Sequence, residues 1–325
     1  MTCNNGQMNE PGASRKVSVV VSSYTMDRSD DMISALKSLF DQTYQDLEII
    51  VVVDEDYVLY TELLKFTGKV ESSKEVKVVY NQNGWGLSSG RNRGIEVSSG
   101  SIVAFIDDDA IASPQWIENL VAVYKKYDDA GCVTGKIEPL WMEIDCSWLP
   151  TCFYWLISCT YRDMHEECEV RNGFGTNISF RRTVFNEIGL FLTDLGKCKG
   201  KGLLSEEMEL CLRLRERTNR KVIYTPEAVV QHKVYPFRVT LRALARRAFH
   251  DGLSKALINR MYRKSRPLET EFSLLNHLLV VFYPQCVVGL FREPSLYARQ
   301  LVATALIVLS EALGFSYGML FKIKQ

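Results

Sequence analysis

The sequence predicts an α/β fold organised around a parallel-type sheet, and three observations lead to this prediction. Short β-branched runs alternate with helical patterns along the first part of the chain. Polar and acidic residues follow several of these runs at the point where each predicted strand ends. With 325 residues, 46% of them hydrophobic, the chain is long enough to bury a substantial core.

Four strands are predicted in this first part, with helices between them. Residues 17–21 are a β-branched run of the kind found in buried strands, and residues 47–56 are predicted as a second buried strand. Residues 76–82 and 101–109, the latter with its apolar run at 102–106, supply further strands. Apolar residues recur at helical spacing in the segments between or after these strands, at 33–40, 57–66 and 113–127.

Two helices carry start signals. Ser113 and Pro114 precede an amphipathic segment, as its N-cap and first helical residue. Ser205 precedes two glutamates, which place negative charge in the first turn of the second helix. After that helix, residues 221–234 have the composition of paired extended segments.

The C-terminal part of the chain differs in composition from the rest. Residues 237–266 are strongly basic, with apolar residues at helical intervals. This pattern suits an interfacial helix on anionic lipid as well as a solvated helix packed on the domain, so both interpretations stay open. Two apolar segments follow, 272–291 and 301–320, each near membrane-spanning length. The sequence therefore predicts membrane association, whether by spanning the bilayer, lying in its interface or re-entering it as a hairpin.

The balance of charge and the N-terminal segment disfavour other classes of protein. Basic and acidic residues number 39 each, so no overall positive field favours a nucleic acid partner. The nine cysteines form no CxxC pair, and they predict reduced thiols in a cytoplasmic protein. Residues 1–16 are polar and lack the apolar core of a signal peptide, so we expect a disordered lead-in.

Three consecutive carboxylates, Asp107, Asp108 and Asp109, follow the strand predicted at residues 102–106. Adjacent like charges repel, and unpaired carboxylates at the edge of a core are costly. A divalent cation removes this cost, because hard cations such as Mg²⁺ and Mn²⁺ prefer oxygen ligands and share their shell with substrate phosphates. The alternative is a cluster that caps the helix predicted to begin at Pro114.

Other polar residues follow the neighbouring predicted strands. Ser22 and Tyr24 come after residues 17–21, and Asp54 ends the next strand. Ligands of parallel sheets bind beyond the carboxyl ends of the strands, so these side chains are candidate ligand contacts. The segment GLSSGRNRGI adds flexible backbone and Arg91. It is neither a Walker loop nor a Rossmann GxGxxG, so a kinase and a dehydrogenase are both disfavoured.

The chain resembles the family 2 glycosyltransferases in five segments that occur in the family's order: VSVVVSSY, EIIVVVDED, GLSSGRNRGIEVSSGSIVAFIDDDA, GTNISFRR and SEEMEL. The resemblance covers residues 17–232 and implies the GT-A fold, a Rossmann-like mixed sheet that binds nucleotide-diphospho-sugars. It implies a GT-A glycosyltransferase domain at residues 17–236, followed by a helical membrane-associated region at residues 237–325.

Carried over to this sequence, the resemblance implies roles for Asp54, Arg91 and the three consecutive aspartates. Asp54 would bind uracil, and Arg91 would lie on the nucleotide side of a UDP-sugar donor. Asp107 would face the ribose or uridine, with Asp108 as a further contact to the nucleotide sugar. Asp109 would bind the divalent cation, Mg²⁺ or Mn²⁺.

The later motifs imply the catalytic base. The family's usual Glu-Asp pair is Glu206-Glu207 here, a departure that lengthens the second side chain by one methylene. We choose Glu207 as the base, with Glu206 as a supporting contact. His232 is either a further metal ligand or a structural histidine, and Asn177 either contacts a sugar or forms a turn.

A narrower resemblance is to archaeal glucuronosyltransferases of protein N-glycosylation, in the segments FYWLISCTYR, EVRNGFGTNISFRR, EEMELCLRL and PEAVVQHKV. It implies an inverting transfer of glucuronate from UDP-glucuronate to a dolichyl phosphate-linked sugar, with the catalytic domain on the cytoplasmic face of the cell membrane. The rivals are a UDP-hexose transferase for polysaccharide or glycolipid and a polyprenyl-phosphate sugar synthase. An inactive sugar-nucleotide sensor or scaffold is disfavoured because both sets of carboxylates are present.

Overall fold

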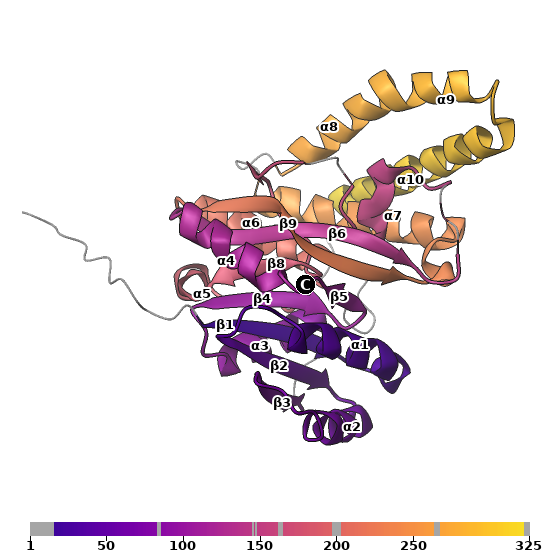
Figure 1. The fold of residues 1–325 in the computed structure, drawn as a ribbon. Helices are drawn as coiled ribbons and strands as arrows, with labels where there is room; N and C mark the ends of the chain where they lie inside the picture. The colour runs from indigo at the N-terminus through magenta and orange to yellow at the C-terminus, as the bar shows by residue number, and fades with distance from the viewer. Residues whose placement is uncertain are drawn as a thin grey trace, which may run out of the picture.

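The computed structural model describes residues 16–82, 86–144, 146, 148–161, 165–196, 203–262 and 267–321. The predicted disordered lead-in lies outside these residues, except for Lys16. A central sheet has helices on both faces, and a helical arm formed by α8, α9 and α10 projects from one end (Figure 1).

The sheet is mixed, as the predicted fold requires. Eight of the strands in the described part of the chain follow the order β3-β2-β1-β4-β8-β6-β9-β5, and β7 pairs with β9. The pairs β3–β2, β2–β1 and β1–β4 are parallel, whereas β8 runs antiparallel to both β4 and β6. The strands are β1 (Val17–Ser23), β2 (Leu47–Asp54), β3 (Glu75–Asn81), β4 (Ile102–Asp107), β5 (Ala110–Ala112), β6 (Ala130–Trp141), β7 (Cys168–Glu169), β8 (Ile178–Arg181) and β9 (Lys221–Val234).

Both faces of the sheet are covered, which explains why the first strands are apolar without alternation. Val19 and Ile49 point to the face that packs against α1, α2 and α4. Val20 and Ile50 point to the opposite face, against α3, α5 and α6. The helices of this part are η1 (Met26–Arg28), α1 (Ser29–Phe40), α2 (Tyr57–Thr67), α3 (Leu87–Val97), α4 (Trp116–Lys126), η2 (Thr151–Ile157), α5 (Arg182–Ile188), α6 (Glu206–Arg217) and η3 (Pro236–Arg238).

The glycine-rich segment predicted as flexible backbone is helix α3, and its glycines permit close packing. A Cβ atom on Gly94 would lie 2.3 Å from a methyl carbon of Val20 in β1. A Cβ on Gly90 would lie 3.0 Å from Ser22 Oγ. The small residues therefore let α3 lie directly on β1, which brings Arg91 to the strand ends.

Two predicted boundaries differ from the structure. Helix α4 begins at Trp116, whose N–H donates to the carbonyl of Ser113 at 3.0 Å, so the predicted cap lies in the turn before the helix. Residues 221–234 form the single strand β9 rather than two paired segments. Strand β9 pairs with β6 along its whole length, with a register shift between Gly135 and Lys136 of β6. It also pairs with β7 near its start and with β5 near its end.

Helix α7 (Leu241–Met261) packs tightly on α10 (Pro294–Leu320), as Figure 1 shows. A Cβ on Gly252 would lie 2.1 Å from the carbonyl oxygen of Glu311, and one on Gly314 would lie 1.9 Å from that of Phe249. Residues Leu241–Met261 of the basic segment therefore form a helix packed on the rest of the chain, although Arg242 remains exposed.

The two C-terminal apolar segments form an arm of antiparallel helices (Figure 1). The first runs continuously through α8 (Glu269–His277), the π-helical turn η5 (Leu278–Phe282) and α9 (Tyr283–Gly289), and the second is α10. Both stretches are long and apolar enough to cross a membrane.

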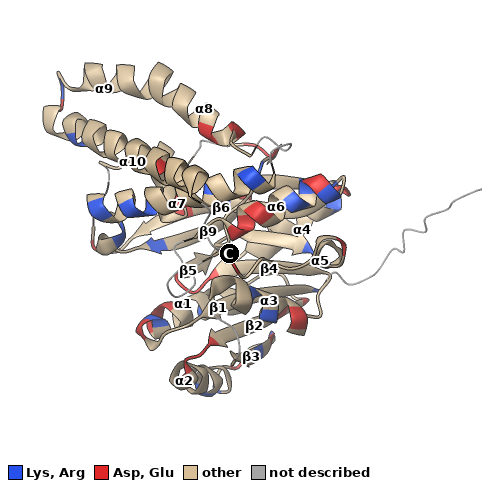
Figure 2. Cartoon of the chain, turned by 180° about the vertical axis from the view of Figure 1, so that it is seen from behind, with Lys and Arg blue, Asp and Glu red and all other residues tan. Residues whose placement is uncertain are grey.

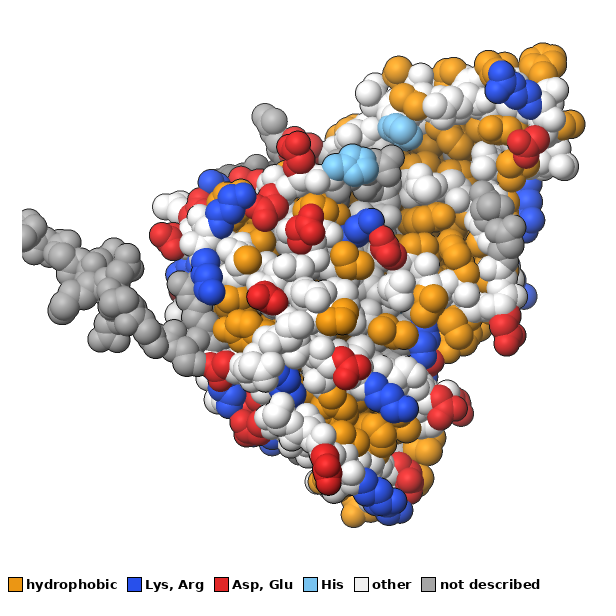
Figure 3. Space-filling model, in the orientation of Figure 1, with side chains coloured by type: hydrophobic (Ala, Val, Ile, Leu, Met, Phe, Trp, Pro, Cys, Tyr) orange, Lys and Arg blue, Asp and Glu red, His pale blue; other side chains and the backbone are white. Residues whose placement is uncertain are grey.

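The arm exposes apolar side chains to its surroundings. Figure 2 shows long uncharged stretches along it, and Figure 3 shows hydrophobic side chains gathered over it. A continuous apolar surface of this kind favours association with a membrane. The large exposed apolar residues on the arm are Phe272, Leu275, Leu279, Val280, Val281, Val287, Val288, Val302, Leu306, Leu309, Leu313, Tyr317 and Leu320.

Candidate active site

A cavity of about 710 Å³ lies at the carboxyl ends of β1, β2 and β4, where the sequence predicts a ligand. We call it the strand-end cavity. Its wall is completed by η1, by Gly86 at the start of α3, and by the end of β9. Of the predicted residues, it brings together Ser22, Tyr24, Asp54, Asp107, Asp108, Asp109 and His232.

Strand register places these residues next to one another. Ser22 of β1 pairs with Asp107 of β4, because the two parallel strands end together. His232 of β9 pairs with Ala110 of the short strand β5, which directly follows the carboxylate triplet. The antiparallel pairing of β9 with β5 therefore brings a histidine to the acidic triplet, although the two segments are far apart in the sequence.

Asp109 is buried and lies against three cationic or ionisable groups. Its Oδ1 is 3.2 Å from Nε2 of His232, and its Oδ2 is 2.6 Å from a guanidinium nitrogen of Arg238. A guanidinium nitrogen of Arg28 lies 3.4 Å from Oδ2. Although burial alone would raise it, the hydrogen bond from His232 and the charge of Arg238 hold the pKa of Asp109 well below its ordinary value.

The side chains of Asp107, Asp109 and His232 form a group that can hold a metal ion. One ligand atom from each residue lies within 4.8 Å of the others. Two carboxylates and an imidazole suit Mn²⁺, and the carboxylates also suit Mg²⁺. The donor set therefore fits a divalent cation, which would compete with Arg238 for Asp109.

Asp108 points away from this group and pairs with Arg28. Its two carboxylate oxygens accept from Arg28 at 2.7 Å and from Ser23 Oγ at 2.6 Å. Burial raises the pKa of Asp108 to about 6, despite the nearby Arg28. These contacts connect the triplet to η1, so Asp108 helps to shape the cavity wall.

Asp54 lies at the far side of the strand-end cavity, buried beside Asn81 of β3. Asn81 Nδ2 donates to its carboxylate at 2.6 Å, and burial raises the pKa of Asp54 to about 6. Ser22 Oγ is buried and has no hydrogen-bond partner among the described residues. Tyr24 is 59% exposed at the rim, with the guanidinium of Arg28 over its ring. The carboxylate of Asp54, the unsatisfied hydroxyl of Ser22 and the aromatic ring of Tyr24 thus all line the strand-end cavity.

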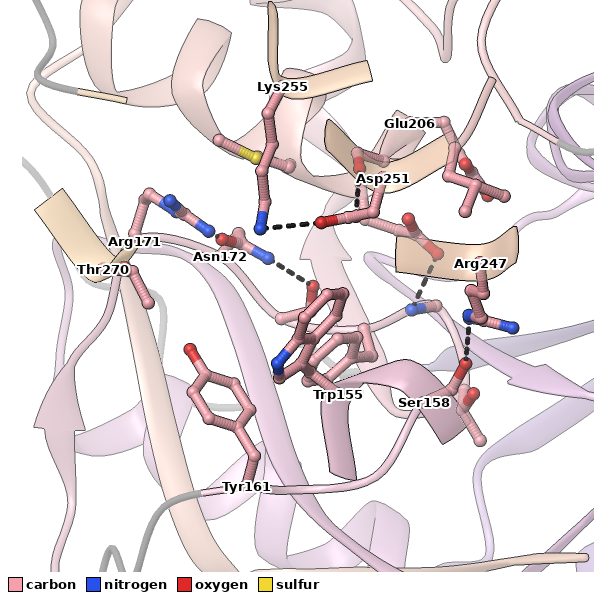
Figure 4. Close-up of a pocket in the computed structure, with 18 of the residues that line it drawn as sticks. Trp155, Ser158, Tyr161, Arg171, Asn172, Glu206, Arg247, Asp251, Lys255 and Thr270 are labelled. Carbon is pink, nitrogen blue, oxygen red and sulfur yellow. Dashed lines mark hydrogen bonds and ion pairs between the residues drawn. The ribbon is translucent and has the colours of Figure 1, made fainter. Parts of the chain in front are cut away.

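A second cavity, of about 140 Å³, adjoins the first on its helical side (Figure 4). We call it the helix-side cavity. It is enclosed by η2, the segment before β8, the start of α6, and helices α7 and α8. Trp155 and Tyr161 provide aromatic surface in it, and the ammonium of Lys255 lies 4.7 Å from the centre of the Trp155 ring. Leu87, Asp107 and Ser158 line both cavities.

Glu206 and Glu207 open helix α6 at this junction. Oε1 of Glu207 accepts from the backbone N–H of Gly175 at 2.9 Å and from Arg91 at 3.1 Å. No described residue hydrogen-bonds its Oε2, and the Glu207 side chain is 16% exposed to the helix-side cavity. Glu206 is more deeply buried and contacts Arg91 at 3.0 Å. Both glutamates line the helix-side cavity, and the carboxylate of Glu207 is the more exposed of the two.

Arg91 lies between the acidic triplet and the two glutamates rather than out in the strand-end cavity. Besides the glutamates, it pairs with Asp107 at 3.3 Å. Although burial raises it, the charge of Arg91 holds the pKa of Asp107 below its ordinary value. Thr176 also donates to Asp107, at 2.6 Å. One buried guanidinium thus connects both predicted functional groups.

Asn177 does not reach either cavity. It is fully buried, its Oδ1 accepts from Trp116 Nε1 at 2.8 Å, and its Nδ2 donates to the carbonyls of Lys136 and Ala228. Its side chain ties β8 to α4, β6 and β9, so it positions the neighbouring Thr176 instead of contacting a sugar.

Several cavity residues are missed by sequence reasoning. Arg28 pairs with Asp108 and Arg238 pairs with Asp109, but neither arginine belongs to a recognisable motif. Ser158 and Arg247, which are hydrogen-bonded at 2.8 Å, reach the cavities from η2 and α7. One signal could have found Arg238 and Arg247. Both belong to the basic segment at residues 237–266, which sequence reasoning interprets only as a lipid-facing or solvated helix.

Comparisons with known proteins agree with this geometry. The family model described as Glycosyl transferase family 2 matches residues 18–189. A glucosyl-dolichyl phosphate glucuronosyltransferase of Haloferax volcanii is 35% identical over 307 residues, which are 94% of this chain and 96% of that protein.

Solved structures support the fold. A mannosyltransferase from Pyrobaculum calidifontis, in complex with GDP-Man and Mn²⁺, has a TM-score of 0.61 at 16% identity, over 93% of this chain and 87% of its own. GalNAc-T7 with UDP, GalNAc and Mn²⁺ has a TM-score of 0.54 at 16% identity, over 82% of this chain and 56% of its own. With the family match and the Haloferax relative, these findings show that the chain is a glycosyltransferase of GT-A fold that belongs to glycosyl transferase family 2.

Proposed function

We propose that this protein transfers glucuronate from UDP-glucuronate to a dolichyl phosphate-linked sugar, in the pathway of protein N-glycosylation. The observation that carries the proposal is the junction at Asp107, which lines both cavities and has the candidate metal ligands on one side and Glu207 on the other. The similarity to the Haloferax glucuronosyltransferase over nearly the full length of both chains supports the choice of substrates.

The strand-end cavity would hold the nucleotide. Asp54 would accept the imide N–H of uracil, and the unsatisfied hydroxyl of Ser22 lines the same cavity. Asp107, Asp109 and His232 would hold Mg²⁺ or Mn²⁺, which when bound stabilises negative charge on the departing diphosphate. Asp108 and Arg28 keep the wall of the cavity in place.

Glu207 would act as the general base from the helix-side cavity. Arg91 and the N–H of Gly175 fix its Oε1, so the same carboxylate presents Oε2 to an acceptor hydroxyl. Oε2 takes the hydroxyl proton while the hydroxyl oxygen attacks the anomeric carbon from the face opposite UDP. The new bond forms as the bond to UDP breaks, so an α-linked donor gives a β-linked product.

The apolar arm would bring the enzyme to its lipid-linked acceptor. Leu279 and Leu309 on its exposed surface suit the acyl region of a membrane, and the helix-side cavity is lined by α8 of the same arm. We place the catalytic domain on the cytoplasmic face, where nucleotide sugars are made. Residues 17–236 would form the GT-A domain and residues 237–325 the membrane-associated region, with Arg238 and α7 also serving as cavity wall.

A donor screen tests the proposal. The purified protein is offered UDP-glucuronate, UDP-glucose, UDP-galactose and GDP-mannose, each with dolichyl phosphate-glucose and Mg²⁺ or Mn²⁺, and products are identified by mass. We expect one glucuronate added per lipid-linked glucose. Transfer of a neutral hexose, or transfer directly to dolichyl phosphate, would favour one of the rival transferases. UDP binding without metal dependence, and no UDP release with any acceptor, would support a sensor.

A further inference from the structure

The cationic side chains of the helix-side cavity differ in how their charge is balanced. The cavity is lined by Arg91, Arg171, Arg247 and Lys255. Arg171 pairs with Glu271 at 2.7 Å, and Arg91 pairs with three carboxylates. Lys255 likewise lies within 3.0 Å of carboxylate oxygens from three residues.

Arg247 is the exception among these four. It is partly buried, and within the described part of the chain it has no carboxylate at ion-pair distance. Its side chain donates to Ser158 Oγ at 2.8 Å, as Figure 4 shows. The charges of Asp251, Glu207 and Asp107 act on it only at longer range, and burial lowers its pKa. A guanidinium in this situation is stabilised by an anionic ligand.

The position of Arg247 specifies which part of a ligand reaches it. Its hydrogen-bond partner Ser158 lines both cavities, and so does Asp107. If the nucleotide occupies the strand-end cavity and the acceptor hydroxyl meets Glu207, the donor sugar must occupy this junction. A sugar at this junction lies beside Ser158, and thus within reach of Arg247.

We infer that Arg247, oriented by Ser158, binds the carboxylate of a uronate donor sugar and thereby selects UDP-glucuronate over UDP-glucose. This inference rests on the proposed function. The two donors differ only at C6, a carboxylate in one and a hydroxymethyl group in the other, so the guanidinium discriminates by charge. A planar guanidinium also offers two parallel N–H groups to a carboxylate, which a hydroxymethyl group cannot match.

The test compares donor specificity in Arg247→Gln with that of the wild-type protein. With dolichyl phosphate-glucose as acceptor, we expect kcat/KM for UDP-glucuronate to fall about 10- to 100-fold, and kcat/KM for UDP-glucose to stay the same or rise. Ser158→Ala should shift the ratio in the same direction by a smaller factor. Arg247→Lys, which keeps the charge but loses the paired N–H geometry, should be intermediate.

Arg246→Gln is the matched control, because Arg246 is exposed on the same helix and lies outside both cavities. It should leave the donor ratio unchanged. Equal losses with both donors, or a raised KM for the lipid-linked acceptor with an unchanged donor ratio, would overturn the inference; the latter would assign Arg247 to the acceptor phosphate. If Arg247→Gln does not fold, the Ser158→Ala and Arg247→Lys ratios decide in its place.

The outcome separates this inference from the proposed function. A wild-type enzyme that transfers only neutral hexoses overturns the glucuronate assignment itself. A wild-type enzyme that transfers glucuronate, together with an unchanged ratio in the variants, overturns only the role of Arg247.

Discussion

The strand-end cavity and the helix-side cavity meet at Asp107, but they are built in different ways. The first is formed mostly by residues at the ends of neighbouring parallel strands, which lie near one another as soon as the sheet forms. The second is assembled from η2, the segment before β8, α6, α7 and α8, which are distant in sequence. The nucleotide side of the site is therefore a product of sheet topology, whereas the acceptor side depends on how later segments pack around it.

Glu207→Gln gives the largest expected effect and acts only on the helix-side cavity. The amide cannot accept the hydroxyl proton, so we expect kcat to fall about 1,000-fold. UDP affinity, measured by calorimetry, should stay within about twofold of wild type, because Glu207 does not line the strand-end cavity. Retained transfer would reject this base, and a parallel loss of UDP binding would show that the two cavities are not separable.

Asp109→Asn tests the strand-end cavity at the candidate metal site. Loss of one charged ligand should lower transfer about 100-fold and make activity require higher concentrations of Mg²⁺ or Mn²⁺. Chelation of the wild-type protein should have a similar effect and be reversed by added cation. A metal titration followed by UDP release measures both; Asp108→Asn serves as comparison, since Asp108 lies outside the candidate cluster.

Leu279→Asp and Leu309→Asp test the arm that lies beyond the helix-side cavity. Both side chains are exposed and apolar, so each change should lower the membrane partition coefficient roughly 30-fold if the arm is lipid-bound. Vesicle flotation gives the measurement. Leu64→Asp, at an exposed position on α2, is the control and should have no effect. UDP binding should be unchanged in all three proteins. If both arm variants still bind membranes as the wild type does, the arm is not what anchors the protein to the membrane.

The smallest expected effect is a pH dependence of uridine binding that comes from Asp54. Its pKa is raised to about 6 by burial, with Glu55 raising it further and Asn81 lowering it, so it is ionised at pH 7 and protonated at pH 5. A protonated carboxyl accepts the uracil N–H more weakly than a carboxylate does, and affinity should fall by up to about tenfold over this interval. Uridine is used because it lacks the diphosphate that a bound metal ion would contact. Asp54→Asn should bind weakly at both pH values, and a steep pH dependence in that variant would assign the titration elsewhere.

Sequence reasoning predicts the strand-end cavity well, for a physical reason. Asp54 and Asp107 are the last residues of buried strands, and parallel strands end at a common edge. The position of His232 beside the triplet cannot be predicted in this way, because it depends on the pairing of β9 with β5, which no local pattern specifies. The cavity follows from local patterns, and its histidine follows from topology.

The helix-side cavity is less accessible to such reasoning. The start of α6 is recognised from its glutamates, but Arg247 has no motif and reaches the site only because α7 packs across it. Asn177 illustrates the opposite error, since a polar residue in a family motif is used entirely inside the fold. Sequence reasoning predicts flexible backbone at the glycines of α3, although their spacing at positions 90 and 94 indicates one face of a helix.

The ion cluster around Lys255 limits the order in which amino-acid substitutions can accumulate during evolution. Lys255 of α7 pairs with Asp251 of the same helix, with Glu271 of α8 and with Glu311 of α10. Loss of the lysine alone would leave three inward carboxylates without their common partner, which is strongly unfavourable, whereas loss of one carboxylate leaves two. We therefore expect that, during evolution, the acidic residues are replaced before the lysine. Because these residues lie on α7, α8 and α10, sequence changes in the arm and in α7 should be correlated.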